Sequence, residues 1–327
     1  MKALITGVAG MLGSHLLDEL MNNPVYETVF GIDDLSVGVT GNIAQWDGNP
    51  RFKFINGSIL DESLISGIPR VDIVIHLAAS KKIGEINPGV ENLYVNGIGA
   101  ANIFKMALKH KAKVLFASTS DCYGMSKDLP FKEDGDLVLG PSMIKRWSYA
   151  VGKLYSEQLA FAFHKDYGLP VVIIRYFGGF SERASFSWSG GHIPIFIDAI
   201  LKDMPCIIHG DGLQTRSMTY VSNLVDGTLL AMENDNAIGE LINIGDDREI
   251  SVLDSAKIIH GLSGSKNPLD LKFISTEKIF GSYKDIMRRR PDLSKATSLL
   301  GYKIKTSFEE GIMKVVKERK KCGGKVK

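Results

Sequence analysis

Residues 2–13 run Lys2-Ala3-Leu4-Ile5-Thr6-Gly7-Val8-Ala9-Gly10-Met11-Leu12-Gly13, and this stretch decides the fold. Its apolar start predicts a buried strand, and the glycines that follow predict a turn into a helix. The first glycine permits the tight turn, the second lets a pyrophosphate approach the backbone, and the third lets the helix pack on the strand. Amides at the helix N-terminus can then bind phosphate. We therefore expect a dinucleotide site at Gly7, Gly10, Met11, Leu12 and Gly13.

The alternation of strand and helix continues through the first half of the chain. Apolar runs predict strands over residues 3–6, 28–32, 52–55, 71–77, 114–118 and 171–176, and helical patterns lie over 13–21, 97–110 and 148–167. The predicted fold class is α/β, a doubly wound parallel sheet of the Rossmann type. After about residue 177 the rhythm breaks. We therefore predict a dinucleotide-binding domain over 1–177 and a smaller, partly interleaved substrate domain over 178–327, with some segments returning to the first.

An acidic pair ends the second predicted strand. Asp33 lies about twenty residues past the glycine loop, where a carboxylate hydrogen-bonds ribose hydroxyls. Asp34 follows it and no arginine is adjacent, so a 2′-phosphate would be repelled. These residues predict NAD rather than NADP as the cofactor, although Asp33 as a simple turn residue is the alternative.

Tyr149 and Lys153 are four residues apart and share one face of a predicted helix. A lysine ammonium beside a phenol favours the phenolate, so the tyrosine can act as a base below its free pKa near 10. Tyr123 and Lys127 have the same spacing, but Gly124 makes that segment a strand exit. The 149–153 pair is therefore the predicted acid–base site.

Bulk composition excludes several classes of function. The chain has 327 residues, 44% of them hydrophobic, and a net charge of +2, so we expect no nucleic-acid partner. Three scattered cysteines form no disulfide framework and suit a reducing compartment. No signal peptide or membrane-length apolar run is visible, and we predict a cytoplasmic protein with no membrane partner and no metal site.

Several motifs in order resemble one family. They are Gly7/Gly10/Gly13, Asp33, His76-Leu77-Ala78-Ala79, Asn96, Ser118-Thr119-Ser120 and Tyr149/Lys153, with Gly210-Asp211-Gly212, Asn243-Ile244-Gly245 and Arg289-Arg290-Pro291-Asp292 in the second half. Together they resemble the extended short-chain dehydrogenase/reductase family, in its nucleotide-sugar epimerase, decarboxylase and dehydratase branch. The resemblance covers nearly the whole length.

The resemblance implies a role for each motif residue. Tyr149 would be the acid and base, Lys153 would bind the nicotinamide ribose and lower the tyrosine pKa, and Thr119 would hydrogen-bond the sugar hydroxyl. Further cofactor contacts would come from Ser58, Ile59, Leu77, Ala78, Ala79, Asn96 and Ser118, and substrate contacts from Ser120, Arg183, Arg216 and Arg289. The resemblance also implies a homodimer formed by the helices over 97–110 and 148–167.

The reaction depends on residues 120 and 121. Proteins of the branch oxidise the sugar to a transient ketone, and 4,6-dehydratases carry Asp-Glu where this chain has Ser120-Asp121. Decarboxylases often carry Glu at the position of Asp121, and Arg146-Trp147 resembles some of them. We predict an NAD-dependent nucleotide-sugar 4-epimerase acting on a UDP-sugar through a 4-keto intermediate, with Asp121 among the catalytic residues.

Three alternatives stay open at this point: a nucleotide-uronate decarboxylase, a 4,6-dehydratase, and a catalytically silent protein that binds NAD or a sugar nucleotide. The chain also departs from the family pattern at Gly178-Gly179, at Ser181-Glu182-Arg183 and in the segment 186–192. These departures affect the predicted substrate contacts more than the redox chemistry.

Overall fold

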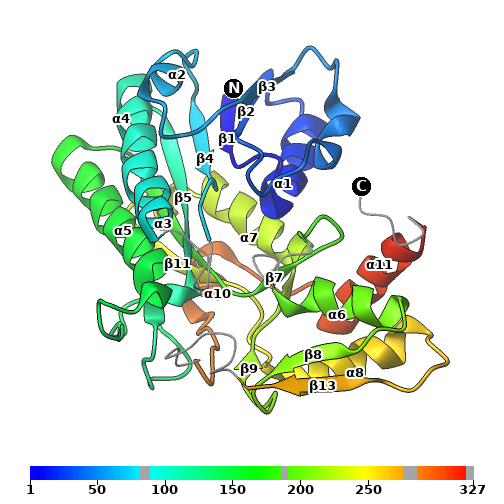
Figure 1. The fold of residues 1–327 in the computed structure, drawn as a ribbon. Coiled ribbons are helices and arrows are strands. Elements are labelled where there is room, and N and C mark those ends of the chain that lie inside the picture. Colours follow the sequence, from blue (N-terminus) through cyan, green and yellow to red (C-terminus); the bar gives the residue numbers. More distant parts are fainter. Residues whose placement is uncertain (82–88, 186–190, 276–285, 322–327) are drawn as a thin grey trace.

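The computed structural model describes residues 1–81, 89–185, 191–275 and 286–321. Its centre is a sheet of seven parallel strands in the order β11-β6-β5-β4-β1-β2-β3 (Figure 1). The strands are β1 (Lys2–Thr6), β2 (Thr28–Asp33), β3 (Phe52–Asn56), β4 (Ile73–His76), β5 (Lys113–Thr119), β6 (Val171–Tyr176) and β11 (Leu241–Ile244). The predicted doubly wound α/β sheet is confirmed.

Helices cover both faces of this sheet, and for that reason both faces are apolar. In β1, Ala3 and Ile5 join the buried cluster under one layer of helices, whereas Leu4 joins the cluster under the other. The first layer holds α1 (Met11–Asn22) and α7 (Val221–Glu233); the second holds α2 (Glu62–Ser66), α3 (Gly89–Leu93), the π-helical turn η3 (Tyr94–Gly99), α4 (Ala100–His110) and α5 (Ser148–Tyr167).

One segment from the second half of the chain completes the sheet. Strand β11 pairs with β6, with Leu241 opposite Ile173. The sequence predicted that some segments return to the first domain, but it did not predict this strand, because only the motif Asn243-Ile244-Gly245 was visible there.

Most of the remaining elements gather at the carboxyl ends of the sheet strands, where β7 follows the end of β6, whereas α10 packs beside β11 and α7 (Figure 1). They include three two-stranded pairings, β7 with β10, β9 with β12, and β8 with β13. Their bounds are β7 (Gly179–Phe180), α6 (His192–Leu201), β8 (Cys206–His209), β9 (Thr215–Arg216), β10 (Thr219–Tyr220), β12 (Ile250–Ser251), α8 (Val252–Ser263), β13 (Leu271–Ile274), α10 (Ser294–Leu300) and α11 (Phe308–Lys321). In doubly wound folds ligands bind at this edge.

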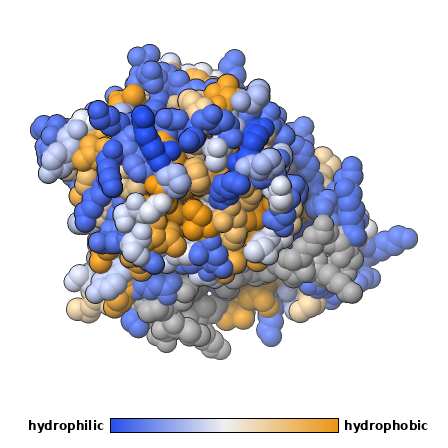
Figure 2. Space-filling model, turned by 90° about the horizontal axis from the view of Figure 1, so that it is seen from above, coloured by the Kyte–Doolittle hydropathy of each residue, from blue (hydrophilic) through white to orange (hydrophobic). Residues whose placement is uncertain are grey.

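The surface mixes polar and apolar areas. Figure 2 shows an apolar patch near the middle of the upper face with hydrophilic residues around it.

Within the described ranges, none of the helices combines the length and apolar character needed to cross a bilayer. The same ranges hold no group of three or more His, Cys, Asp or Glu placed to bind a metal. Residues 186–190 of the atypical segment lie outside the described residues.

The contact of α1 with the glycine loop leaves no room for a side chain. A Cβ on Gly13 would lie 2.2 Å from the Gly7 carbonyl oxygen and 2.9 Å from Val8 Cα, and backbone atoms cannot rotate away. We expect Gly13→Ala to lower the free energy of unfolding by about 1–3 kcal/mol and to weaken NAD binding, because α1 must move off the loop. Denaturant unfolding and calorimetry with NAD measure both effects.

Gly261→Ala is the matched control. Gly261 lies in α8, and a Cβ there would meet no atom within 4 Å. Alanine favours helix over glycine by about 1 kcal/mol, so this variant should be equally or more stable. Equal unfolding free energies for wild type and Gly13→Ala would show that α1 moves without cost, against our argument.

Candidate active site

Helix α5 presents Tyr149 and Lys153 to the carboxyl end of β5. Their exposed fractions are 7% and 2%. Lys153 Nζ donates to the carbonyl oxygen of Ala117 at 2.8 Å, and the side chain of Thr119 is hydrogen-bonded to Tyr149. The structure therefore brings together the helical pair and the strand-end threonine that the sequence singled out.

The buried surroundings shift both titratable groups away from their charged forms. Burial, followed by the charge of Asp121, raises the pKa of Tyr149, and burial lowers the pKa of Lys153 to about 8. The net shift of the Tyr149 pKa is upward, because desolvation of the phenol outweighs the hydrogen bond of Thr119 and the charge of Arg289. A lowering contribution from Lys153 stays a prediction.

Asp121 is surrounded by cations. It lies in the 3₁₀ turn η4 (Ser120–Tyr123) after β5. Its carboxylate is 2.8 Å from Arg146, 2.9 Å from Arg289 and 4.0 Å from the ammonium of Lys81. Burial by itself would raise the pKa of Asp121, but the charges of Arg289, Arg146 and Lys81 hold it well below its usual range. Asp121 therefore stays ionised and is a poor proton donor.

Two of the cations that pair with Asp121 also lie close to Tyr149 and to Ser120 at the end of β5. The Lys81 ammonium lies 5.8 Å from the centre of the Tyr149 ring. Arg289 also donates to the hydroxyl of Ser120, at 3.5 Å. Two predicted substrate residues, Ser120 and Arg289, are thus placed beside Tyr149 and Asp121.

The two other arginines predicted to bind substrate lie in different places. Arg216 of β9 donates to the carbonyl oxygen of Ile286 at 2.7 Å, and its charge acts on Lys81. Arg183 forms an ion pair with Asp18 of α1 at 2.6 Å, so its predicted contact with substrate stays a prediction. We call Lys81, Arg146, Arg216 and Arg289 the cationic cluster.

His192, at the start of α6, lies close to this cluster. Its side chain is buried, and burial together with the charge of Arg216 lowers its pKa to about 3. His192 is therefore neutral at physiological pH and adds no charge to the site.

A cavity opens at the carboxyl ends of β1, β2 and β4, beside the glycine loop. Asp33 lines it and accepts hydrogen bonds from the backbone amides of Ala9 and Leu35, each at 2.9 Å. The other predicted cofactor residues that line it are Gly7, Gly10, Ile59, Leu77, Ala78 and Ala79. Gly38, which the sequence did not single out, lines it as well, and a Cβ there would lie 2.9 Å from Asp33 Oδ2.

The remaining predicted cofactor residues lie outside the lining of this cavity. Met11 and Leu12 begin α1, whereas Gly13 serves the packing of that helix on the loop. The other three polar side chains bind protein atoms: Ser58 accepts from the Leu60 amide, Asn96 donates to the Ser80 and Asn92 carbonyl oxygens, and Ser118 donates to Glu157. Direct contacts of these residues with cofactor stay predictions.

Sequence reasoning did not assign two members of the cationic cluster to the site. Arg146 lies three residues before Tyr149, a spacing that places it near the same face of a helix. Lys81 follows the end of β4, the sheet edge at which ligands of this fold bind. Neither signal is specific, because each residue joins the site through its ion pair with Asp121. That carboxylate lies 40 positions from Lys81 and 25 positions from Arg146 in the chain.

Comparisons with known proteins agree with this geometry. A model of the NAD dependent epimerase/dehydratase family matches residues 3–245. The chain is 36% identical over 318 residues to the UDP-N-acetyl-alpha-D-glucosaminuronate decarboxylase of Bacillus cytotoxicus. This alignment covers 96% of each protein. It is 34% identical to UDP-glucuronic acid decarboxylase 3 of Arabidopsis thaliana, over 95% of this chain and 87% of the relative.

Solved structures give the same family. The UDP-glucuronic acid 4-epimerase of Bacillus cereus, in complex with UDP-glucuronic acid and NAD, has a TM-score of 0.85 at 32% identity, over 98% of this chain and 100% of the other. The UDP-glucose 4-epimerase of Thermotoga maritima has a TM-score of 0.86 at 28% identity, over 98% and 99%.

The cavity beside the glycine loop fits the family's cofactor, NAD. Gly7 has a φ of +72°, and a Cβ on it would lie 2.9 Å from the amide nitrogen of Ala78, so a larger residue would push into the neighbouring strand end. Asp33 faces the same cavity with a carboxylate suited to ribose hydroxyls. On these grounds the chain belongs to the NAD-dependent epimerase/dehydratase family of the extended short-chain dehydrogenases/reductases.

Proposed function

We propose that this protein is an NAD-dependent decarboxylase of a UDP-linked uronate. The observation that carries the proposal is the charge of the site. Among the described residues, three members of the cationic cluster lie within 4.0 Å of one carboxylate, that of Asp121, and the charge of the fourth, Arg216, acts on Lys81, so positive charge exceeds negative charge there. A UDP-uronate carries about three negative charges, two on the pyrophosphate and one on the sugar, whereas a UDP-hexose lacks the third.

The relatives support the same substrate class. The decarboxylases named above align over nearly the whole chain, and another named relative, UDP-glucuronic acid decarboxylase 1 of Danio rerio, is 34% identical over 96% of this chain. The predicted 4-epimerase is not confirmed, and the relatives favour the decarboxylase that was its alternative.

In the proposed mechanism Tyr149 removes the proton from the sugar C4 hydroxyl, which the Thr119 hydroxyl holds in place. NAD, when bound, supplies the oxidation of C4 and its later reduction, and its positive nicotinamide favours the Tyr149 phenolate. The carboxylate on C5 is then β to the C4 ketone. Its C–C bond breaks, carbon dioxide leaves, and the electron pair moves onto the ketone oxygen beside Tyr149 and Thr119.

A solvent proton then adds to C5, and Tyr149 returns its proton to the C4 oxygen as the ketone is reduced. Asp121 does not donate a proton in this scheme, because its ion pairs keep it charged. Its role is to hold Arg146 and Arg289 in the positions where they meet the anionic substrate.

A UDP-uronate 4-epimerase is the second candidate, favoured by the likeness to the Bacillus cereus enzyme. It would use the same charges and the same ketone. The two reactions differ in what happens to the ketone: an epimerase reduces it on the opposite face, with no loss of carbon.

Analysis of the reaction products separates these two reactions. Incubation with UDP-glucuronate or UDP-N-acetylglucosaminuronate should release carbon dioxide and leave a UDP-pentose or its acetamido counterpart by mass spectrometry, and UDP-glucose should not react. Asp121→Asn should lower this rate more than about tenfold, or about 1.4 kcal/mol, because Arg146 and Arg289 lose their partner. A 4-epimer of unchanged mass, without carbon dioxide, would establish the epimerase and reject our choice.

Tyr149→Phe tests the acid–base step. We expect turnover to fall by at least about two orders of magnitude, the usual scale for a positioned proton-transfer group. NAD content and thermal unfolding should change little, because the phenyl ring fills the same buried space. Near-normal turnover would show that another group moves the proton. Tyr123 is a poor substitute, since its hydroxyl donates to Asn243 at 2.7 Å.

We also propose a homodimer formed through η3 and α5. Large apolar or aromatic side chains stay exposed along these two elements and at the end of α3, where no other described part of the chain covers them: Leu93 of α3, Tyr94 and Ile98 of η3, and Val151 and Tyr155 of α5. An isologous contact between two copies would bury this face.

Light scattering at micromolar concentration should give the mass of a dimer. Ile98→Glu should give the monomer, because two buried carboxylates would face each other near the two-fold axis. Lys272→Glu, on the distant strand β13, is the control and should leave the dimer intact. A monomeric wild type would refute the proposal.

A further inference from the structure

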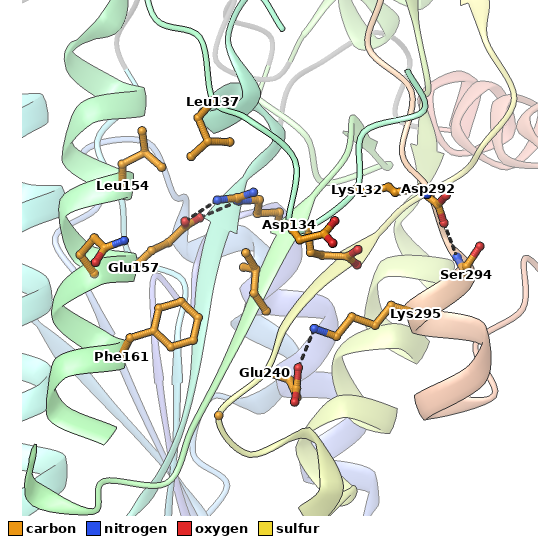
Figure 3. A pocket seen from close by; sticks show the side chains of 15 residues that line it. Lys132, Asp134, Leu137, Leu154, Glu157, Phe161, Glu240, Asp292, Ser294 and Lys295 are labelled. Atoms are coloured by element: carbon orange, nitrogen blue, oxygen red, sulfur yellow. Dashed lines mark hydrogen bonds and ion pairs between the residues drawn. The ribbon is translucent and has the colours of Figure 1, made fainter. Parts of the chain in front are cut away.

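A cavity of about 650 Å³ lies beside α5 (Figure 3). The segment 132–137, α5, β6, β11 and the start of α10 line it. Within it Glu157 of α5 forms a buried ion pair with Arg175 of β6. Neither side chain belongs to the site described above.

Glu157 binds two strands at once. Its Oε1 accepts from Arg175 Nε at 2.9 Å and its Oε2 from Arg175 Nη2 at 2.7 Å. Oε1 also accepts a short hydrogen bond from the hydroxyl of Ser118 on β5. Ser118 lies between Ala117, whose carbonyl oxygen binds Lys153, and Thr119, whose side chain binds Tyr149. The carboxylate is therefore fixed to the strand at the one residue between both catalytic contacts.

Glu157 lies on the same face of α5 as Tyr149 and Lys153. Tyr149, Lys153 and Glu157 occur at intervals of four, so they form one buried stripe of α5. A helix fixed at Glu157 can neither slide nor rotate without moving Tyr149 from Thr119. We infer that the Glu157–Arg175 ion pair, together with Ser118, is a positioning device that sets the register of α5 against β5 and maintains the charge of Lys153.

Among the described groups around Lys153, Glu157 is the negatively charged one. These groups are Tyr149 and Glu157 on α5, Cys122 after β5 and His76 at the end of β4, with the cation Arg175 of β6 paired to Glu157. Burial raises the pKa of the Cys122 thiol and of Tyr149 and lowers that of His76, so these three are neutral. The negative charge of Glu157 favours the ammonium form of Lys153.

A purely stabilising role explains this pair poorly. Burying an ion pair costs desolvation energy that its attraction often fails to recover, and apolar replacements are frequently as stable. Arg175 Nη1 is moreover buried without a hydrogen-bond partner in the structure. A pair that contributes little net stability but joins helix, β5 and β6 at the catalytic end fits a positional function better.

The test is Glu157→Gln in the intact protein with NAD. The amide keeps the shape but loses the charge and one of its acceptor oxygens. We expect kcat to fall at least about tenfold while KM changes less than about threefold, because a misplaced helix affects the chemical step more than substrate binding. The alkaline limb of the pH–rate profile should also move to lower pH. Without the nearby negative charge, Lys153 loses its proton more easily than at its present pKa of about 8.

Two more variants complete the design. If Glu157→Gln does not fold, Glu157→Gln/Arg175→Gln replaces it, because no unpaired buried cation remains; its kcat should fall by the same factor. Lys295→Ala is the matched control: it removes a second ion pair of this cavity, Lys295 of α10 with Glu240 just before β11, at 2.6 Å. It should keep kcat and the pH profile within about twofold.

The inference rests on the catalytic pair and holds for a decarboxylase or an epimerase, so failure of the proposed reaction would leave it standing. Normal kcat and an unmoved alkaline limb in Glu157→Gln, or in the double variant where that replaces it, would overturn it. A loss of rate that only follows the loss of folded protein or of NAD would overturn it as well.

Discussion

Asp121 imposes the constraint on which this site depends. Its carboxylate is 2% exposed, and a charge so deeply buried persists only beside compensating charges. Arg146 and Arg289 supply them at 2.8 and 2.9 Å. These two arginines come from different halves of the chain, one just before α5 and one just before α10. The need to neutralise one carboxylate therefore fastens the second half of the chain to the catalytic end of the sheet.

The same balance of charge explains what the site can bind. One carboxylate cannot neutralise the whole cationic cluster, and mutually close cations in a partly desolvated pocket repel one another. An anionic ligand removes this repulsion, which is why we propose a substrate with both a pyrophosphate and a sugar carboxylate. In that proposal the surplus of positive charge selects the class of substrate before any hydroxyl of the sugar is contacted.

Acid–base chemistry and charge compensation are separated on α5. Tyr149 lies beside the cationic cluster, whereas Glu157, two turns further along the same stripe, pairs with Arg175 in the cavity beside the helix. Between them, the ammonium of Lys153 is positioned by its hydrogen bond to the carbonyl oxygen of Ala117, and its charge depends on its distance from Glu157. A small movement of the helix would change all three relationships together, because they share one stripe of side chains.

Local sequence determined the sheet, the glycine loop and the catalytic pair. Apolar runs of strand length, glycines at a fixed spacing and a Tyr–Lys pair one helical turn apart are encoded within a few residues, so their patterns are readable without the fold. Strand β11 was not predicted, because a run of four residues, three of them apolar, in an irregular half carries no sign of which strand it joins. The 4-epimerase prediction depended on the identity of Ser120 and Asp121 in the sequence, without knowledge of the cations that surround Asp121 in the structure.

Only the tertiary structure decided the charge of the site and the support of its helix. Lys81, Arg146, Arg216 and Arg289 occupy four separate parts of the chain, and Ser118, Glu157 and Arg175 occupy three elements. Electrostatic energy depends on distance in space and on burial, and neither quantity is written in sequence separation. The sequence therefore determined which residues are available for catalysis, and the packing of α5, β5 and β6 decided which of them are charged and where they meet.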